Sequence, residues 1–208
     1  MVLALLHTSP VHVPVFDALR DTDHPGLGLR HLVYEDLLTR ARESGPEAVS
    51  GEIRALLAGA VAEGASAVLC TCSTIGGVAE SAAATIGVPV LRVDRPMAAA
   101  AAERERLVVL ATQSATLGPT LALLAEEAGD RPVEVRTVMV DGAWARFEAG
   151  DRDGYLDLVA AAVDAVTDAD VIVLAQASMA DAVTRTATRI PVLSSPRPGL
   201  AAAAAAAR

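Results

Sequence analysis

Two cysteines, Cys70 and Cys72, are the most reactive side chains of this 208-residue chain. An apolar run over 67–71 reads as a buried strand that ends at Cys72, and a helix is expected to begin directly after it. Backbone N–H groups at a helix start favour a nearby anion and lower the pKa of a thiol. Cys72 is therefore a candidate thiolate base or nucleophile, with the hydroxyls of Ser73 and Thr74 as donors to a carboxylate.

Both cysteines also have a plain structural interpretation, because a buried free Cys serves as a small core residue. Cys70 shares a strand face with Cys72 but lies deeper, so we expect Cys70 to be part of the core. Cysteines two positions apart on a strand have poor geometry for a disulfide. A Cys-x-Cys metal site would need further ligands, and only His7 and His31 lie at plausible strand ends. No metal site is expected.

Hydroxyl side chains at the ends of predicted strands form a second group of candidates. They are Thr8, Ser9, Thr112, Ser114, Thr116 and Ser178. Ser and Thr are ordinary turn and cap residues, but their recurrence at matching places in two halves favours donors that hold one small polar ligand. His7 and His31 are candidate proton donors or carboxylate partners, and either could equally be a loop histidine.

The elements that must position these residues are short apolar strands separated by longer helical segments. The expected strands are 2–7, 32–34, 67–71, 88–93, 107–112, 133–140, 171–175 and 190–194. The expected helices are 47–63, 76–86, 96–104, 117–129, 154–167 and 179–187, and an Ala-rich helix over 201–207 is expected to pack on the first half. Continuous apolar strands joined by helices predict an α/β fold with parallel sheets. Ligands of such sheets bind beyond the carboxyl ends of the strands, where the polar residues cluster.

An internal repeat divides the chain into two similar halves. Thr8 and Thr112 are 104 positions apart in similar segments, and Cys72 and Ala177 are 105 apart. We therefore predict two pseudo-symmetric, doubly wound parallel-sheet halves with a shared active-site cleft between them. The expected domains are 1–94, to which 195–208 returns, and 95–194, and equivalent strand ends should bring Cys72 and Ala177 face to face.

Composition excludes several classes of function. The net charge is −9, and the basic residues are scattered arginines, which argues against nucleic acid and anionic membranes as partners. The chain contains no Lys, so a lysine Schiff base and a P-loop lysine are excluded. No targeting or membrane-spanning segment is evident, and two cysteines form no disulfide framework. We expect a cytoplasmic protein.

Several motifs resemble those of the aspartate/glutamate/hydantoin racemase superfamily. These are His7-Thr8-Ser9, Thr71-Cys72-Ser73-Thr74, Arg92-Val93-Asp94-Arg95-Pro96-Met97, Ala111-Thr112-Gln113-Ser114-Ala115-Thr116 and Pro191-Val192-Leu193-Ser194-Ser195-Pro196. The resemblance implies a cofactor-independent enzyme with two α/β domains, which acts on a small carboxylic acid and forms a homodimer or a higher homo-oligomer. It also implies one Cys from each half at the substrate's α-carbon, and backbone N–H groups with Ser and Thr hydroxyls at its carboxylate.

The chain departs from this pattern in the second half. In place of the family's Gly-Cys-Thr, the chain has Gln176-Ala177-Ser178, so the second thiol is missing. Two-base racemisation needs a base on one face of the substrate and an acid on the other. The sequence thus predicts an isomerase that works through the single thiolate of Cys72. The alternatives are a one-cysteine decarboxylase or lyase, and a carboxylate-binding sensor without catalysis.

Overall fold

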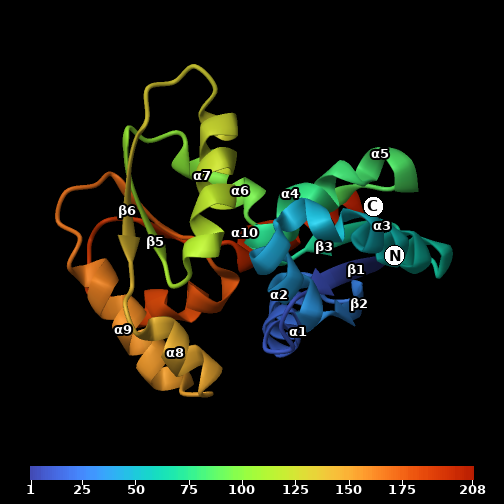
Figure 1. Ribbon diagram of the computed structural model, residues 1–208, viewed down its shortest axis with the longest axis horizontal. Helices are drawn as coiled ribbons and strands as arrows, with labels where there is room; N and C mark the ends of the chain where they lie inside the picture. Colours follow the sequence, from blue (N-terminus) through green and yellow to red (C-terminus); the bar gives the residue numbers. More distant parts are fainter. The chain divides into compact units, whose positions relative to one another are not determined.

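A computed structural model describes all 208 residues and divides the chain into two compact units. Unit 1 comprises Met1–Pro96 together with Pro196–Arg208, and unit 2 comprises Met97–Ser195. Each unit holds one four-stranded, fully parallel sheet flanked by helices (Figure 1). The predicted α/β class with parallel sheets is confirmed.

Unit 1 is built on the sheet order β2-β1-β3-β4. Its strands are β1 (Val2–His7), β2 (Gly28–Val33), β3 (Ala67–Cys70) and β4 (Val90–Arg92). Its helices are α1 (His12–Asp23), α2 (Glu35–Ser44), the 3₁₀ helix η1 (Pro46–Val49), α3 (Ser50–Ala62), α4 (Ser73–Ser81), α5 (Ala83–Ile86) and α10 (Pro196–Ala206). The helix α6 (Arg95–Ala101) begins at the last two residues of the first segment of unit 1 and continues into unit 2.

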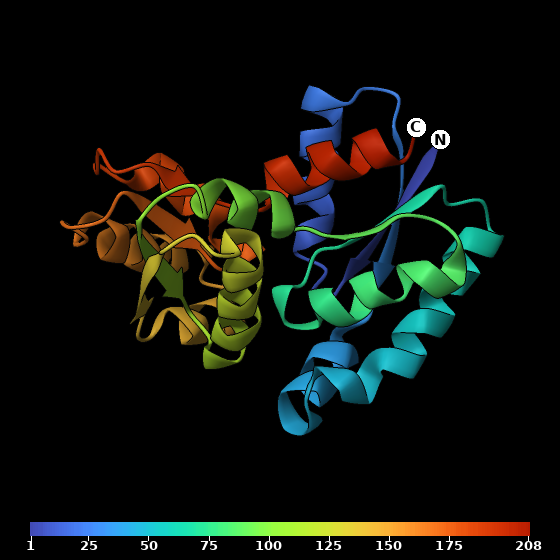
Figure 2. The same ribbon diagram turned by 90° about the horizontal axis from the view of Figure 1, so that it is seen from above.

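Helices cover both faces of the first sheet, which is why β1 is an unbroken apolar run. On one face, Leu5 packs with Phe16 of α1 and Leu200 of α10, and Figure 2 shows α10 (red) running beside α1 (blue). On the other face, Leu6 packs with Ile53 of α3 and with residues of α2 and α4. The Ala-rich α10 thus belongs to the core of unit 1.

Unit 2 repeats this arrangement with the order β6-β5-β7-β8. Its strands are β5 (Arg106–Ala111), β6 (Glu134–Met139), β7 (Val171–Leu174) and β8 (Val192–Leu193). Its helices are α7 (Ser114–Ala128), α8 (Ala143–Glu148), α9 (Arg152–Asp164) and the 3₁₀ helix η2 (Ala177–Arg185). Val109 packs against α6 and α7 on one face, and Leu110 packs against α9 on the other.

The sequence repeat corresponds to equal strand register in the two sheets. Leu6 of β1 pairs with Cys70 of β3, and Leu110 of β5 pairs with Leu174 of β7. Both pairs lie near the carboxyl ends of central strands. Leu6 and Leu110 are 104 positions apart in the chain, and so are Cys70 and Leu174. Thr8 and Thr112, two residues later, therefore occupy equivalent places in the two units. The same register makes Gln176, not Ala177 as the sequence repeat predicts, the equivalent of Cys72, and both are helix N-cap residues.

Several elements differ from the prediction. The strand β2 lies at a sheet edge and mixes polar with apolar residues, so a search for apolar runs finds only its end, whereas the edge strand β6 agrees with the predicted strand over 133–140. The helices α1, α2 and α8 are additional to the predicted ones, and the segment predicted as a helix over 179–187 is the 3₁₀ helix η2. Helices of the length and apolar character needed to cross a bilayer are absent.

Candidate active site

Cys72 follows the carboxyl end of β3 and directly precedes the start of α4, and both elements are labelled in Figure 1. Cys72 is the N-cap residue of α4, with an extended backbone (φ −110°, ψ 115°), and it is partly exposed. Ser73 and Thr74 form the first turn of the helix and are buried. The dipole of α4 and its terminal N–H groups favour an anion at this end, which suits a carboxylate or a thiolate.

Cys70 is in a different environment, although only Thr71 separates it from Cys72. It is fully buried among the residues between the sheet and the helices α3 and α4. Burial raises the pKa of the Cys70 thiol, and the neighbouring Cys72 adds to this effect. The Cys70 sulfur lies 3.7 Å from the carbonyl oxygen of Cys72, to which it donates a weak hydrogen bond. Cys70 is thus a protonated core thiol.

A buried ion pair between Arg92 and Asp94 packs against α4. The Arg92 guanidinium donates two hydrogen bonds to the carboxylate of Asp94, at 2.7 and 2.9 Å, and both side chains are buried. The guanidinium passes directly beneath Gly76, where a Cβ atom would lie 3.1 Å from the Arg92 Cβ and 3.2 Å from its Nε. The glycine at position 76 thereby lets the helix approach β4 closely and fixes the place of its N-terminus.

His7, at the carboxyl end of β1, lies at the centre of a chain of buried polar contacts. Its Nδ1 is 2.7 Å from the hydroxyl of Thr71, and its Nε2 is 2.8 Å from Nδ1 of His31. The other ring nitrogen of His31 faces the Asp17 carboxylate at 3.3 Å. These contacts join β1, β2, α1 and the segment that leads to Cys72.

The electrostatics of this cluster keep His7 uncharged. Burial, followed by the repulsion of protonated His12 and His31, lowers the pKa of His7 to about 3. Neutral His7 carries one N–H. The Thr71 hydroxyl donates its proton to the Leu6 carbonyl at 3.1 Å, so the N–H of neutral His7 lies on Nδ1 and donates to the Thr71 oxygen. Nε2 of His7 is then the acceptor that faces Nδ1 of His31.

Unit 2 carries a polar cluster of its own at the ends of β5 and β7. The amide oxygen of Gln176 accepts the Thr112 backbone N–H at 2.7 Å and the Thr112 hydroxyl at 2.9 Å. The hydroxyls of Ser178 and Tyr155 are hydrogen-bonded to each other at 2.8 Å. Ala177, the first residue of η2, lies between Gln176 and Ser178 in the chain, is buried and offers only a methyl group.

The remaining predicted site residues have no such partners within their units. Thr8 is buried next to His7, and its hydroxyl forms no hydrogen bond in the chain, while Ser9 is partly exposed. Ser114 is the exposed first residue of α7, and Thr116, two residues further along, is buried. In unit 1 the structure therefore brings together His7, His31 and the Thr71–Cys72 segment, and in unit 2 it brings together Thr112, Gln176 and Ser178.

Two residues of these clusters were absent from the candidates derived from the sequence. Asp17 lies in the middle of α1, and its contact with His31 spans fourteen positions. Tyr155 lies in α9 and contacts Ser178 across twenty-three positions. Nothing local marks either residue, since each contact depends on the docking of a helix against a strand end.

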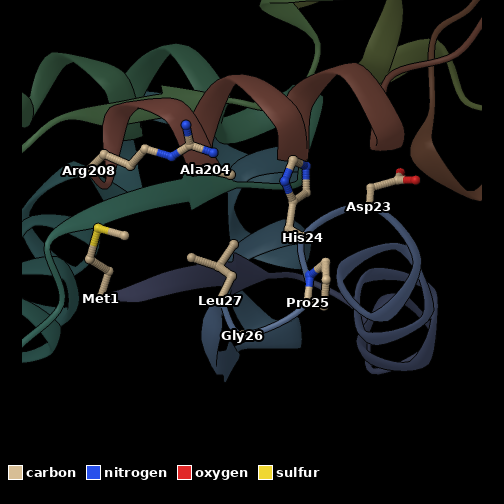
Figure 3. A pocket seen from close by; sticks show the side chains of 8 residues that line it. All are labelled: Met1, Asp23, His24, Pro25, Gly26, Leu27, Ala204 and Arg208. Atoms are coloured by element: carbon tan, nitrogen blue, oxygen red, sulfur yellow. The ribbon is translucent and has the colours of Figure 1, made fainter.

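A hollow on unit 1 is separate from these clusters. It has a volume of about 340 Å³ and lies near the amino ends of β1 and β2, lined by Met1, His24, Leu27 and Arg208 among others (Figure 3). None of the predicted site residues lines it. Groups of three or more His, Cys, Asp or Glu side chains that could hold a metal ion are absent.

The chain is similar in sequence and structure to proteins of one family. The sequence model of the Asp/Glu/Hydantoin racemase family matches residues 13–207. Aspartate racemase from Picrophilus torridus has a similar structure, with a TM-score of 0.68, 16% identity and coverage of 99% of this chain and 92% of that one. Glutamate racemase from Aquifex pyrophilus is similar as well, with a TM-score of 0.65, 16% identity and coverage of 97% of this chain and 82% of that one.

A double mutant of arylmalonate decarboxylase in its liganded form is also similar. Its TM-score is 0.64 at 21% identity, with coverage of 99% of this chain and 92% of that one. No curated protein sequence matches the chain. The structural matches share the two-unit α/β fold.

Proposed function

Because the chain belongs to the Asp/Glu/Hydantoin racemase family, we propose that it is an enzyme acting at the α-carbon of a small carboxylic acid through the thiolate of Cys72. The observation that carries this proposal is the contrast between the two cysteines. Cys72 caps the helix α4 and is accessible, whereas Cys70 is fully buried. The resemblance places the family's second thiol at position 177, where this chain has only a methyl group.

In the proposed reaction, the N-terminus of α4 and the hydroxyls of Ser73, Thr74 and Thr8 hold the substrate carboxylate. The Cys72 thiolate removes the α-proton, and the electron pair of the broken C–H bond moves into the carboxylate to form an enediolate. The positive end of the helix dipole favours the charge that develops there. The Cys72 thiol then returns the proton to the α-carbon. No cofactor is needed, and a single thiol serves one face of the substrate.

Decarboxylation is a second candidate reaction, favoured by Ala177. When the C–C bond to a departing carboxylate breaks, CO₂ leaves and the electron pair stays on the α-carbon. The Cys72 thiol then donates its proton to that carbon. This reaction needs one acid and no base on the opposite face, so a methyl group at position 177 is compatible with it.

Deuterium exchange in D₂O tests the proposal directly. Candidate 2-substituted carboxylic acids are incubated with the protein, and the α-proton is followed by NMR. We expect exchange without inversion in the parent, loss of exchange in Cys72→Ser, and retained exchange in the matched control Cys70→Ala. For malonic acids, release of CO₂ that depends on Cys72 would identify the decarboxylase. Binding of acids without exchange or CO₂ release would contradict both reactions and identify a sensor.

A further inference from the structure

The amide of Gln176 occupies the backbone N–H and the hydroxyl of Thr112, a residue that the sequence predicts as a carboxylate donor in unit 2. Gln176 follows β7 and precedes η2, with an extended backbone (φ −125°, ψ 138°). Its side chain reaches across to the end of β5, where one amide atom lies 2.7 Å from the Thr112 backbone nitrogen and 2.9 Å from the Thr112 hydroxyl.

The chemistry of the contact identifies that amide atom as oxygen. A backbone N–H only donates hydrogen bonds, so the Thr112 N–H must face an acceptor, and the NH₂ group of an amide accepts none. The Thr112 hydroxyl can then turn its proton to the same oxygen. A backbone N–H and a hydroxyl that converge on one sp² oxygen form the arrangement that holds a carboxylate oxygen.

The equivalent position in unit 1 is arranged differently. The strand register makes Thr112 equivalent to Thr8 and Gln176 equivalent to Cys72, and Gln176 and Cys72 are the N-cap residues of η2 and α4. Cys72 carries no amide, and the side chain of the preceding Thr71 contacts Nδ1 of His7 and the carbonyl of Leu6, at 2.7 and 3.1 Å. The Thr8 hydroxyl has no partner in the chain, although Thr8 and Thr112 are equally buried, at 7% and 6% exposure. The donors are thus open in unit 1 and occupied in unit 2.

We propose that Gln176 is an internal substitute for a carboxylate, which closes the Thr112 donors to external acids and restricts recognition of the substrate carboxylate to unit 1. The hydrogen bond between Tyr155 and Ser178 occupies a further hydroxyl of unit 2 in the same way. The restriction on substrate recognition rests on the proposed function. The closure of the Thr112 donors rests only on the hydrogen bonds described above.

Acetate binding to unit 2 tests the closure without any turnover. The ¹⁵N-labelled parent and Gln176→Ala are titrated with sodium acetate against sodium chloride of equal ionic strength, while the Thr112 amide signal is followed by NMR. We expect no acetate-dependent shift in the parent and a saturable shift in Gln176→Ala. Acetate has to displace two hydrogen bonds in the parent, so its affinity there should be lower by roughly tenfold or more.

Gln113→Ala is the matched control, since it removes the same side chain one residue from Thr112 and leaves Gln176 in place. We expect this variant to behave as the parent does towards acetate. Acetamide, an uncharged analogue of the lost side chain, should raise the melting temperature of Gln176→Ala but not that of Gln113→Ala. If Gln176→Ala does not fold, Gln176→Asn, which shortens the side chain by one methylene, takes its place and should show a weaker acetate shift.

Two results would overturn the proposal. The first is an equal acetate shift of Thr112 in the parent and in Gln176→Ala, which would mean that the glutamine does not close the site. The second is a response of the folded variant to acetamide alone, which would mean that the Thr112 donors do not accept a carboxylate. Neither result depends on Cys72, so the failure of this proposal is distinguishable from the failure of the proposed reaction.

Discussion

The buried histidine of β1 leads to a quantitative prediction of how stability depends on pH. In the folded chain, the pKa of His7 is lowered to about 3, first by burial and then by His12 and His31. In the unfolded chain, the pKa of a histidine is about 6.5. Between these values only the unfolded state binds the proton, so the free energy of unfolding falls as the pH drops below about 6.5.

The size of the effect follows from proton linkage. Between pH 7 and pH 4.5, this one group should lower the free energy of unfolding by about 2.5 kcal/mol, with a slope that approaches about 1.4 kcal/mol per pH unit. The loss over this interval is set by the unfolded pKa, since the folded value lies well below 4.5. Carboxylates contribute mainly at lower pH, because their pKa values in unfolded chains are about 4.

Urea unfolding at pH 7, 6, 5 and 4.5, followed by far-UV circular dichroism, compares the parent with His7→Asn. The variant should be less stable at pH 7, because it loses the contacts with His31, but its stability should fall less steeply with acid. His24→Asn removes a histidine outside the cluster and leaves His7 in place, so it should retain the His7 contribution. An NMR titration of the four histidine rings reads the His7 pKa directly.

Two outcomes would refute this reasoning. One is a His7 ring that titrates near pH 6.5 in the folded protein. The other is the same slope of stability against pH in the parent and in His7→Asn. Either result would show that the contacts of His7 with Thr71 and His31 do not hold the ring uncharged.

Three further predictions concern the two cysteines, the helix α4 and the missing thiol. Iodoacetamide should alkylate Cys72 well before the buried Cys70, as peptide mapping would show, and a bound dicarboxylate should slow this labelling. Faster labelling of Cys70 would contradict the assignment of Cys72 as the reactive thiol. Gly76→Ala should lower the free energy of unfolding by about 1–3 kcal/mol, because its Cβ would crowd Arg92. The control Gly59→Ala, where the new Cβ lies in open space on α3, should raise the free energy of unfolding by about 0.5–1 kcal/mol in urea titrations. Equal effects of the two substitutions would contradict a clash between residue 76 and Arg92. Ala177→Cys should racemise an acid whose α-proton the parent only exchanges, and polarimetry should show a rate of inversion about 10²–10⁴-fold above background. A folded variant without inversion would favour decarboxylation.

The sequence by itself determines the fold class and the internal repeat, because both depend on local patterns. Central strands such as 107–111, with both faces covered, have to be continuously apolar, and their spacing in the two halves shows the repeat directly. The different burial of Cys70 and Cys72 is also local, since one lies within β3 and the other beyond its end. An edge strand such as β2 is harder to predict, because solvent on one side allows polar residues.

Only the tertiary structure decides which polar side chains become partners. The contacts from Gln176 to Thr112 and from Thr71 to His7 both join residues 64 positions apart. By strand register the two pairs lie one position apart at corresponding strand ends, since Gln176 corresponds to Cys72 and Thr71 to Ala175, so the two units use different side chains for these contacts. That choice depends on strand register, on side-chain rotamers and on the helices packed over each sheet, which no local pattern encodes. For this reason the sequence indicates where the site residues lie, and the fold determines which of their donors remain open.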